Sequence, residues 1–176
     1  MKGARVILAV FLAAMWGAAT ARAGSFSDQA SLLSPPLRAP SFLFTGRDGA
    51  QHTLADYRGR YVLLNFWATW CGPCRAELPT LDALANRLDA HKMVILPVAE
   101  DRDGDGIAAF YAAHNVTHLP VAVDGDDLAP SLFNLKGVPT TLIVDPQGLI
   151  VARVEGGGDW LSPAAFAFLD RATKNH

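Results

Sequence analysis

Two cysteines are the residues of this chain whose type and spacing most directly suggest chemistry. Cys71 and Cys74 lie in the stretch NFWATWCGPCRAELPT and are separated by Gly72 and Pro73. Such a pair can be a redox-active disulfide, a structural bridge or half of a metal site. A bridge between them would close a ring of only four residues. Since loop-closure stabilisation grows with loop length, that bridge would stabilise the fold little. The spacing therefore favours redox chemistry.

Metal-binding and inert roles for the pair are alternatives with weaker support. A zinc site needs further ligands, but there is no second cysteine pair, and His114 and His118 lie about forty residues beyond Cys74 rather than the dozen or so of a zinc finger. An inert pair has no reason to lie at a strand-to-helix junction, next to Trp70 and with Gly-Pro between the cysteines. We predict a redox-active Cys71–Cys74 disulfide, with no metal and no other cofactor. A metal-handling module that uses the same pair is the alternative from another functional class.

The elements around the pair would place the cysteines at the start of a helix. The run YVLLNFWA, residues 61–68, is apolar on both faces, as expected of a central strand. Apolar residues then recur at helical spacing over residues 72–89. The first helical turn favours a thiolate through the helix dipole and free N–H groups. We predict that Cys71 is the exposed nucleophile and that Cys74, one turn further in, is the buried thiol that resolves the mixed disulfide.

The remaining pattern predicts an α/β fold with a central mixed β-sheet flanked by helices. A second buried strand over residues 93–99 should run parallel to the first, because a crossover helix joins them. Ser162 and Pro163 fit the N-cap and the first position of a final helix. The other predicted elements are a hairpin around residues 47–50, a helix over 105–114, a strand over 121–124, a short helix over 128–134, and a hairpin made by TTLIV and LIVARVE.

The first 40 residues differ in composition from the rest of the chain. Two basic residues, an apolar run over 6–19 and the small-x-small sequence ARA at 21–23 are typical of a secretory leader. We predict a signal peptide over residues 1–23. An uncleaved membrane anchor is the alternative, although the apolar run is shorter than the ~20 residues that span a bilayer comfortably. Serines and prolines over 24–40 predict an extended linker, and residues 41–174 should form one domain.

The charge pattern argues against one class of partner. The chain has a net charge of −2 at pH 7, and the charge becomes more negative if the leader is removed, because the charged residues of the leader are all basic. The chain also lacks basic runs. We therefore expect no binding to nucleic acid.

The stretch FWATWCGPC, the sequence VPTT at residues 138–141 and the order of the elements resemble the thioredoxin superfamily. Within it they look most like the exported TlpA/ResA/CcmG-type thiol-disulfide oxidoreductases. The resemblance implies a thioredoxin-like domain over residues 41–174, with an N-terminal β-hairpin and a central αβ insertion. It also implies that Cys71 is the nucleophile, that Cys74 is the resolving thiol and that Pro139 is the family's cis-proline. The sequence alone does not establish a cis bond, and an ordinary strand-entry proline is the alternative for Pro139.

The same resemblance implies a surface that binds protein substrates. Val138, before the proline, would offer backbone groups that a substrate peptide pairs with as an added strand. The predicted substrate-binding residues are Trp70, Gly72, Pro73, Val138 and Pro139. The partners implied are client protein thiols and disulfides and a membrane electron-donor thiol protein, with the chain itself a monomer.

Asn65 and Glu77 distinguish this chain from cytosolic thioredoxins. Those proteins keep a buried aspartate six residues before the nucleophile, where this chain has Asn65, and an amide cannot accept a proton from the resolving thiol. Glu77 lies on the same predicted helical face as Cys74 and resembles the acid that ResA-type proteins use instead. Burial would raise its pKa towards neutrality and let it take the Cys74 proton. The alternative is a helix-start glutamate that only complements the dipole.

These features predict an exported thiol-disulfide oxidoreductase of the periplasm or cell envelope. Because Gly-Pro separates the cysteines, as in thioredoxin, the resemblance favours a reductant of protein disulfides that acts in cytochrome c-type biogenesis or copper-centre assembly. A protein-thiol oxidant is the alternative, since the intervening dipeptide shifts the redox potential without fixing it.

Other features receive structural interpretations. DRDGDG at residues 101–106 imitates a calcium loop, but Ala112 stands where a bidentate glutamate is required, so we predict a loop with a helix N-cap. The glycines at 156–158 are interpreted as a flexible connection. Trp67 and Trp160 are interpreted as packing residues.

Overall fold

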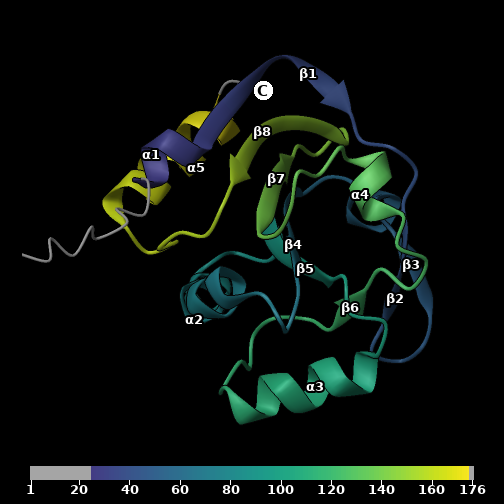
Figure 1. Ribbon diagram of the computed structural model, residues 1–176. Helices are drawn as coiled ribbons and strands as arrows, with labels where there is room; N and C mark the ends of the chain where they lie inside the picture. The colour runs from purple at the N-terminus through teal and green to yellow at the C-terminus, as the bar shows by residue number, and fades with distance from the viewer. Residues whose placement is uncertain (1–24, 175–176) are drawn as a thin grey trace, which may run out of the picture.

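The computed structural model describes residues 25–174, which form one mixed β-sheet with helices packed around it (Figure 1). The predicted signal peptide lies outside these residues. The strands of the sheet follow the order β1-β8-β7-β4-β5-β6-β2-β3. They are β1 (Ala30–Arg38), β2 (Leu43–Gly46), β3 (Gln51–Thr53), β4 (Tyr61–Trp67), β5 (Met93–Ala99), β6 (Ala122–Val123), β7 (Thr140–Val144) and β8 (Leu149–Glu155).

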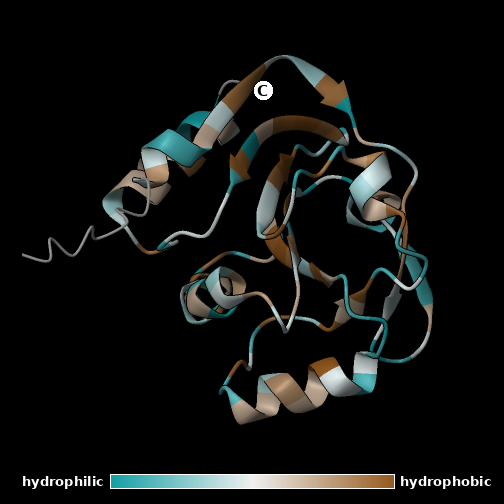
Figure 2. Ribbon diagram, viewed as in Figure 1, coloured by the Kyte–Doolittle hydropathy of each residue, from teal (hydrophilic) through white to brown (hydrophobic). Residues whose placement is uncertain are grey.

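The centre of the sheet consists of the strands that apolar runs predicted. β4 pairs parallel with β5 and antiparallel with β7, and β7 and β8 form a hairpin. The predicted N-terminal hairpin is β2 and β3. Figure 2 shows that apolar residues concentrate on these central strands. Because β4 is buried from Val62 to Trp67, it brings the residues that follow it to a fixed place at its C-terminal end.

Helices and loops cover both faces of the sheet. Alternate β4 residues such as Leu63 and Trp67 pack in the core with α2, α3 and α5, while Leu64 and Phe66 pack with β2, η1 and α4 on the other face. The helices are α1 (Phe26–Gln29), the 3-10 helix η1 (Leu54–Tyr57), α2 (Gly72–Ala85), α3 (Gly104–Ala113), α4 (Ala129–Leu132) and α5 (Pro163–Lys174). The predicted thioredoxin fold, with its central αβ insertion of α3 and β6 between β5 and β7, is confirmed.

Residues 25–40 belong to the fold, so the prediction of a linker over 24–40 is wrong. In Figure 1, α1 lies beside α5, and the Phe26 ring contacts the Phe168 ring with centroids 5.9 Å apart. β1 pairs antiparallel with β8, with a register break between Leu32 and Leu37 that contains Pro35 and Pro36. Serine and proline are common in linkers, but here they lie in an edge strand, where a missing N–H is tolerated.

Some element ends differ from the predicted ones by a few residues. α2 ends at Ala85 rather than at residue 89, and the Arg87 N–H donates to the Leu84 carbonyl at 2.9 Å in a tighter turn. The predicted N-cap of α5 is present, because Ser162 Oγ accepts the N–H of Ala165 at 3.2 Å. Across residues 25–174, no helix has both the length and the apolar character needed to cross a membrane.

Candidate active site

Cys71 and Cys74 form a disulfide at the N-terminus of α2, with their Cα atoms 5.3 Å apart. Cys71 is the N-cap residue, and its sulfur accepts the backbone N–H of Cys74 at 3.2 Å. After reduction, the same donor and the helix dipole would both stabilise a Cys71 thiolate. Cys71 is 6% exposed and Cys74 is 0% exposed. Cys71 is therefore buried rather than exposed as predicted, and of the two cysteines it is the one that keeps some contact with solvent.

The rim around Cys71 contains the residues predicted to bind substrate. Trp70 is 69% exposed, and Gly72 and Pro73 are exposed in the first turn of α2. The Val138–Pro139 bond is cis, as the resemblance implied, and the Val138 carbonyl oxygen lies 3.5 Å from Cys71 Sγ. Two segments distant in sequence thus meet at the reactive sulfur. Their role in binding substrate stays a prediction.

Glu77 lies on α2, three residues after Cys74, and is only 2% exposed. Its Oε1 accepts a hydrogen bond from Asn65 Nδ2 at 2.9 Å, and its Oε2 accepts hydrogen bonds from Gly158 N–H and Trp160 Nε1 at 3.2 Å each. Burial raises the pKa of Glu77 from 4.5 to about 7, against the opposing effect of these three hydrogen bonds. A carboxyl group with this pKa can exchange a proton with a thiol near neutral pH.

Asn65 has a role that the sequence did not reveal. It lies on β4, and its Nδ2 donates both to Glu77 Oε1 and to Thr141 Oγ1 on β7, at 2.9 Å each. Among the described residues its Oδ1 is buried without a hydrogen-bond partner. An aspartate at this position would repel the Glu77 carboxylate, whereas the amide supplies a donor. The only signal in the sequence was that this chain has both Asn65 in place of the usual aspartate and an acid, Glu77, on the helix after the cysteines.

The connection between β8 and α5 also belongs to the site, which corrects two interpretations. Trp160 is buried, as a packing residue would be, but its indole N–H also binds Glu77. The glycine segment is closely packed rather than flexible. A Cβ atom at Gly157 would lie 3.2 Å from the Pro73 carbonyl oxygen, and one at Gly158 would lie 2.7 Å from Cδ2 of Phe26. Only glycine allows the Gly158 N–H to approach Glu77 beneath that ring.

A second carboxylate fixes the loop that leads into Cys71. Asp101 Oδ2 accepts the Thr69 N–H at 2.9 Å, and Oδ1 accepts the Thr69 hydroxyl at 2.6 Å. Beside it, Glu100 is half-buried, and its pKa is raised first by burial and then by Asp124 and Asp101. Asp101 therefore holds the segment that presents Trp70.

The calcium-like sequence forms a helix cap, as predicted. Asp103 is the N-cap of α3 and accepts the N–H of Asp105 at 3.0 Å. Within residues 25–174, no three His, Cys, Asp or Glu side chains are grouped so that they could hold a metal ion.

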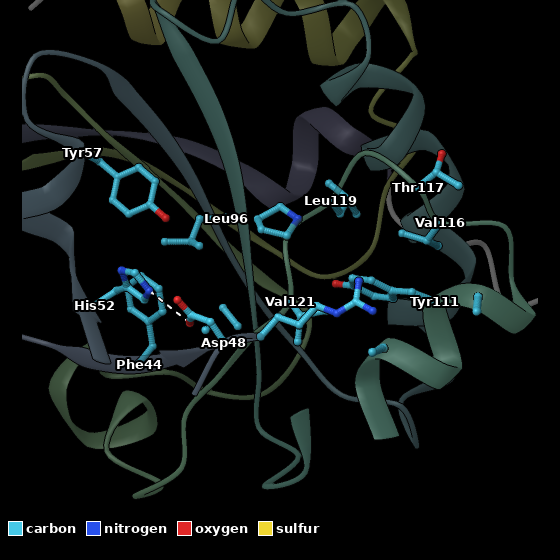
Figure 3. A pocket seen from close by; sticks show the side chains of 16 residues that line it. Phe44, Asp48, His52, Tyr57, Leu96, Tyr111, Val116, Thr117, Leu119 and Val121 are labelled. Atoms are coloured by element: carbon cyan, nitrogen blue, oxygen red, sulfur yellow. Dashed lines mark ion pairs between the residues drawn. The ribbon is translucent and has the colours of Figure 1, made fainter. Parts of the chain in front are cut away.

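Two cavities differ in their relation to the disulfide. One, of about 560 Å³, adjoins the site and is lined by Phe26, Pro73 and Glu77 among others. The other, of about 630 Å³, lies between the β2–β3 hairpin and α3 and contains neither cysteine. Figure 3 shows Tyr57 and Tyr111 on opposite sides of this second cavity. Neither cysteine lines the first cavity either, but that cavity includes Pro73 and Glu77, which lie on α2 on either side of Cys74 in the sequence.

A disulfide with one accessible sulfur, one buried sulfur and a nearby carboxyl of near-neutral pKa is suited to thiol-disulfide exchange. The fold and this site together define a thiol-disulfide oxidoreductase of the thioredoxin-like class. A family model confirms the wider relationship, because residues 37–153 match that of the AhpC/TSA family. The chain belongs to this family.

Individual relatives have the same activity in their names. The chain is 30% identical over 151 residues to the thiol-disulfide oxidoreductase ResA of Geobacillus thermodenitrificans, covering 86% of this chain and 84% of the relative. A solved Chlorobium tepidum structure assigned as thiol:disulfide interchange protein DsbE has a TM-score of 0.69 at 28% identity, covering 78% of this chain and 96% of that one. The exposed lipoprotein thioredoxin of Streptococcus pneumoniae has a TM-score of 0.59 at 27% identity, covering 76% and 98%.

Proposed function

We propose that this oxidoreductase is exported and reduces protein disulfides in the periplasm or cell envelope. The clients would be proteins such as apocytochrome c, through its haem-binding cysteines, or copper-centre assembly proteins. The observation that carries the proposal is the Cys-Gly-Pro-Cys disulfide between an exposed rim and the buried Glu77. The names of the ResA and DsbE relatives agree with it. Export is supported by the leader-like composition of residues 1–23 and by the relative described as an exposed lipoprotein.

The reaction follows from the positions of the two sulfurs. The Cys71 thiolate attacks a client disulfide, forms a mixed disulfide and releases one client thiolate. Cys74 then passes its proton to Glu77 and attacks Cys71 Sγ, which forms the Cys71–Cys74 disulfide and releases the second client sulfur as a thiolate. Two electrons have moved to the client. A membrane thiol protein would return the pair to the reduced form by the reverse exchange.

The direction of electron flow is tested by the equilibrium redox potential. A potential near that of thioredoxin, about −270 mV, is expected for a reductant, and one near −120 mV would show an oxidant instead. Equilibration with glutathione or thioredoxin, followed by alkylation and mass measurement, gives this value. Stoichiometric metal retained by the purified protein, without insulin reductase activity, would contradict the enzyme function altogether.

The client is identified by trapping. In Cys74→Ser, Cys71 can form the mixed disulfide but nothing resolves it, so the client should remain covalently attached. The double variant Cys71→Ser/Cys74→Ser is the matched control and should capture nothing. Capture of thiol-bearing envelope proteins supports the proposal, whereas trapped cytosolic proteins alone would contradict it.

The role proposed for Glu77 has its own test. Glu77→Gln keeps the size of the side chain but cannot accept the Cys74 proton, so resolution should slow by about 100-fold near neutral pH. Stopped-flow decay of a preformed mixed disulfide measures this step directly. Glu155→Gln, the same substitution at the end of strand β8, is the control. Equal rates in wild type and Glu77→Gln across pH would remove Glu77 from the mechanism.

A further inference from the structure

Phe26 joins the N-terminal segment to the active site. It lies in α1, is 9% exposed, and meets the Trp160 ring edge to face with centroids 5.1 Å apart and an interplanar angle of 85°. The same ring also packs edge to face against Phe168 of α5. Aromatic pairs with this geometry favour a fixed relative orientation. The orientation of Trp160 therefore depends on a residue 134 positions earlier in the chain.

The ring of Phe26 also covers the backbone donor next to Trp160. The 2.7 Å approach described above between Phe26 Cδ2 and a Cβ atom placed on Gly158 shows that the ring lies directly on this residue. Gly158 N–H and Trp160 Nε1 donate to one oxygen, Glu77 Oε2. Phe26 thus contacts both residues that bind this oxygen, and it lines the same cavity as Glu77.

We propose that Phe26 is a positioning residue for Glu77: its ring holds Gly158 and Trp160 against the carboxyl group and excludes water from it. The inference rests on the proton-acceptor role proposed for Glu77 and adds a determinant outside the thioredoxin core. It assigns residues 25–29 a part in the redox reaction rather than in packing alone.

Charged neighbours are not among the causes that shift the pKa of Glu77. Apart from Glu77, Asp159 is the only titratable residue that lines the cavity. Asn65 on β4 and Gly158 and Trp160 in the β8–α5 connection bind the Glu77 carboxyl group, and all three are uncharged. On α2 itself, Cys74 titrates once the disulfide is reduced. In the oxidised protein the proton affinity of Glu77 is therefore set by burial and by its hydrogen bonds.

Two substitutions should move the pKa of Glu77 in opposite directions. Phe26→Ala admits water, which lowers the pKa, and loosens the donors Gly158 and Trp160, which raises it. Since burial is the largest influence on this group, the net result should be a fall towards the ordinary value. Trp160→Phe removes a donor to the carboxylate while it keeps an aromatic ring, so the pKa should rise. Phe26→Leu keeps the apolar cover and should leave it near 7.

The measurement is a titration of the oxidised full chain, in which the chemical shift of the labelled Glu77 carboxyl carbon is followed by NMR. This readout does not depend on activity, so it separates the inference from the proposed function. An unchanged midpoint in folded Phe26→Ala would overturn the inference. A shifted midpoint without a parallel shift in the pH profile of mixed-disulfide resolution would leave the inference intact and contradict the role of Glu77.

A second variant covers the case in which Phe26→Ala does not fold. Gly158→Ala places a methyl group where the Phe26 ring lies and should displace the ring, with a downward shift of the Glu77 midpoint. If the midpoint in Gly158→Ala equals that of wild type, the ring does not control the carboxyl group and the inference fails.

Discussion

The two sulfur atoms of the disulfide lie in different surroundings. Cys71 faces a rim made by the exposed Trp70, the exposed first turn of α2 and the cis-proline loop, in which Val138 is half-buried and Pro139 is buried. Cys74 faces the interior, where Glu77 is enclosed by β4, α2 and the β8–α5 connection. Under the proposed function, the open side at Cys71 would bind client proteins, and the closed side around Glu77 would keep one proton acceptor at a constant proton affinity. This separation would let the rim bind different clients without disturbing proton transfer.

The largest expected effect tests which sulfur does which task. Cys71→Ser should lower insulin reduction about a thousandfold or more, and the remaining Cys74 should react slowly with an aromatic disulfide because it is buried. Cys74→Ser should lose turnover equally but react once at the wild-type rate. Stopped-flow measurement with each single variant gives both rates. Equal single-turnover rates for the two variants would show that the two sides are not distinct.

The closed side predicts an unusual dependence of stability on pH. Unfolded Glu77 releases its proton near pH 4.5, but the folded protein keeps it until about pH 7, so folding binds a proton between these values. Stability therefore falls as pH rises through this window and is constant above it. The contribution of Glu77 should shrink by about 3 kcal/mol across the window, corresponding to the shift from 4.5 to about 7.

Urea unfolding of the oxidised protein from pH 4 to 9 measures this effect. Glu77→Gln has no proton to lose and should show no such fall, so the difference between the two curves isolates the group. Curves that stay parallel over the whole range would mean that Glu77 titrates normally in the fold.

The open side predicts a smaller effect that is selective for protein substrates. Trp70→Ala should raise KM for a protein client about tenfold, the size typical of an interface aromatic, because its exposed ring can cover a docked chain. A small aromatic disulfide should react at the wild-type rate. Phe166→Ala, which removes another exposed aromatic ring on α5, is the matched control. A similar loss with both substrates would assign Trp70 to the sulfur chemistry instead.

The smallest effect concerns the loop between the two sides. Asp101→Asn replaces a carboxylate that accepts two hydrogen bonds from Thr69, so stability should fall by about 1 kcal/mol with little change in turnover. Thr69→Val removes one of these bonds, and the two substitutions should be non-additive in a double-mutant cycle. Asp126→Asn, an exposed acid in a later loop, is the control. Additive losses would show that the loop is held by other contacts.

Local sequence patterns predicted much of the fold. The buried runs at 61–68 and 93–99 became β4 and β5, and the helical spacing from Pro73 became α2, because these signals depend on neighbouring residues. The placing of the cysteines at the strand-to-helix junction followed from the same local pattern together with the family resemblance, whereas the burial of Glu77 was only a condition that the structure then met.

Contacts between distant residues could not be predicted in this way. Trp160 has the composition of a packing residue, and only the fold brings its N–H to Glu77. Residues 24–40 have the composition of a linker, and the position of α1 depends on Phe26, the one buried residue of 25–40, meeting residues near the opposite end of the chain. Asn65 was noticed as a missing acid, but its role as a donor depends on Glu77 lying across from β4. The spacing of apolar and polar residues in a single sequence does not show which distant residues come into contact.

The two edge strands of the sheet, β1 and β3, matter for a protein that is proposed to bind other proteins. β3 has only three residues, and β1 carries Pro35 and Pro36 in the stretch where its pairing with β8 is interrupted. An edge strand normally offers a row of free N–H and C=O groups to any extended chain, and proline withholds the N–H. Both edges are therefore poor templates for aggregation. A protein proposed to act on unfolded clients can engage them at its disulfide without recruiting them along its sheet.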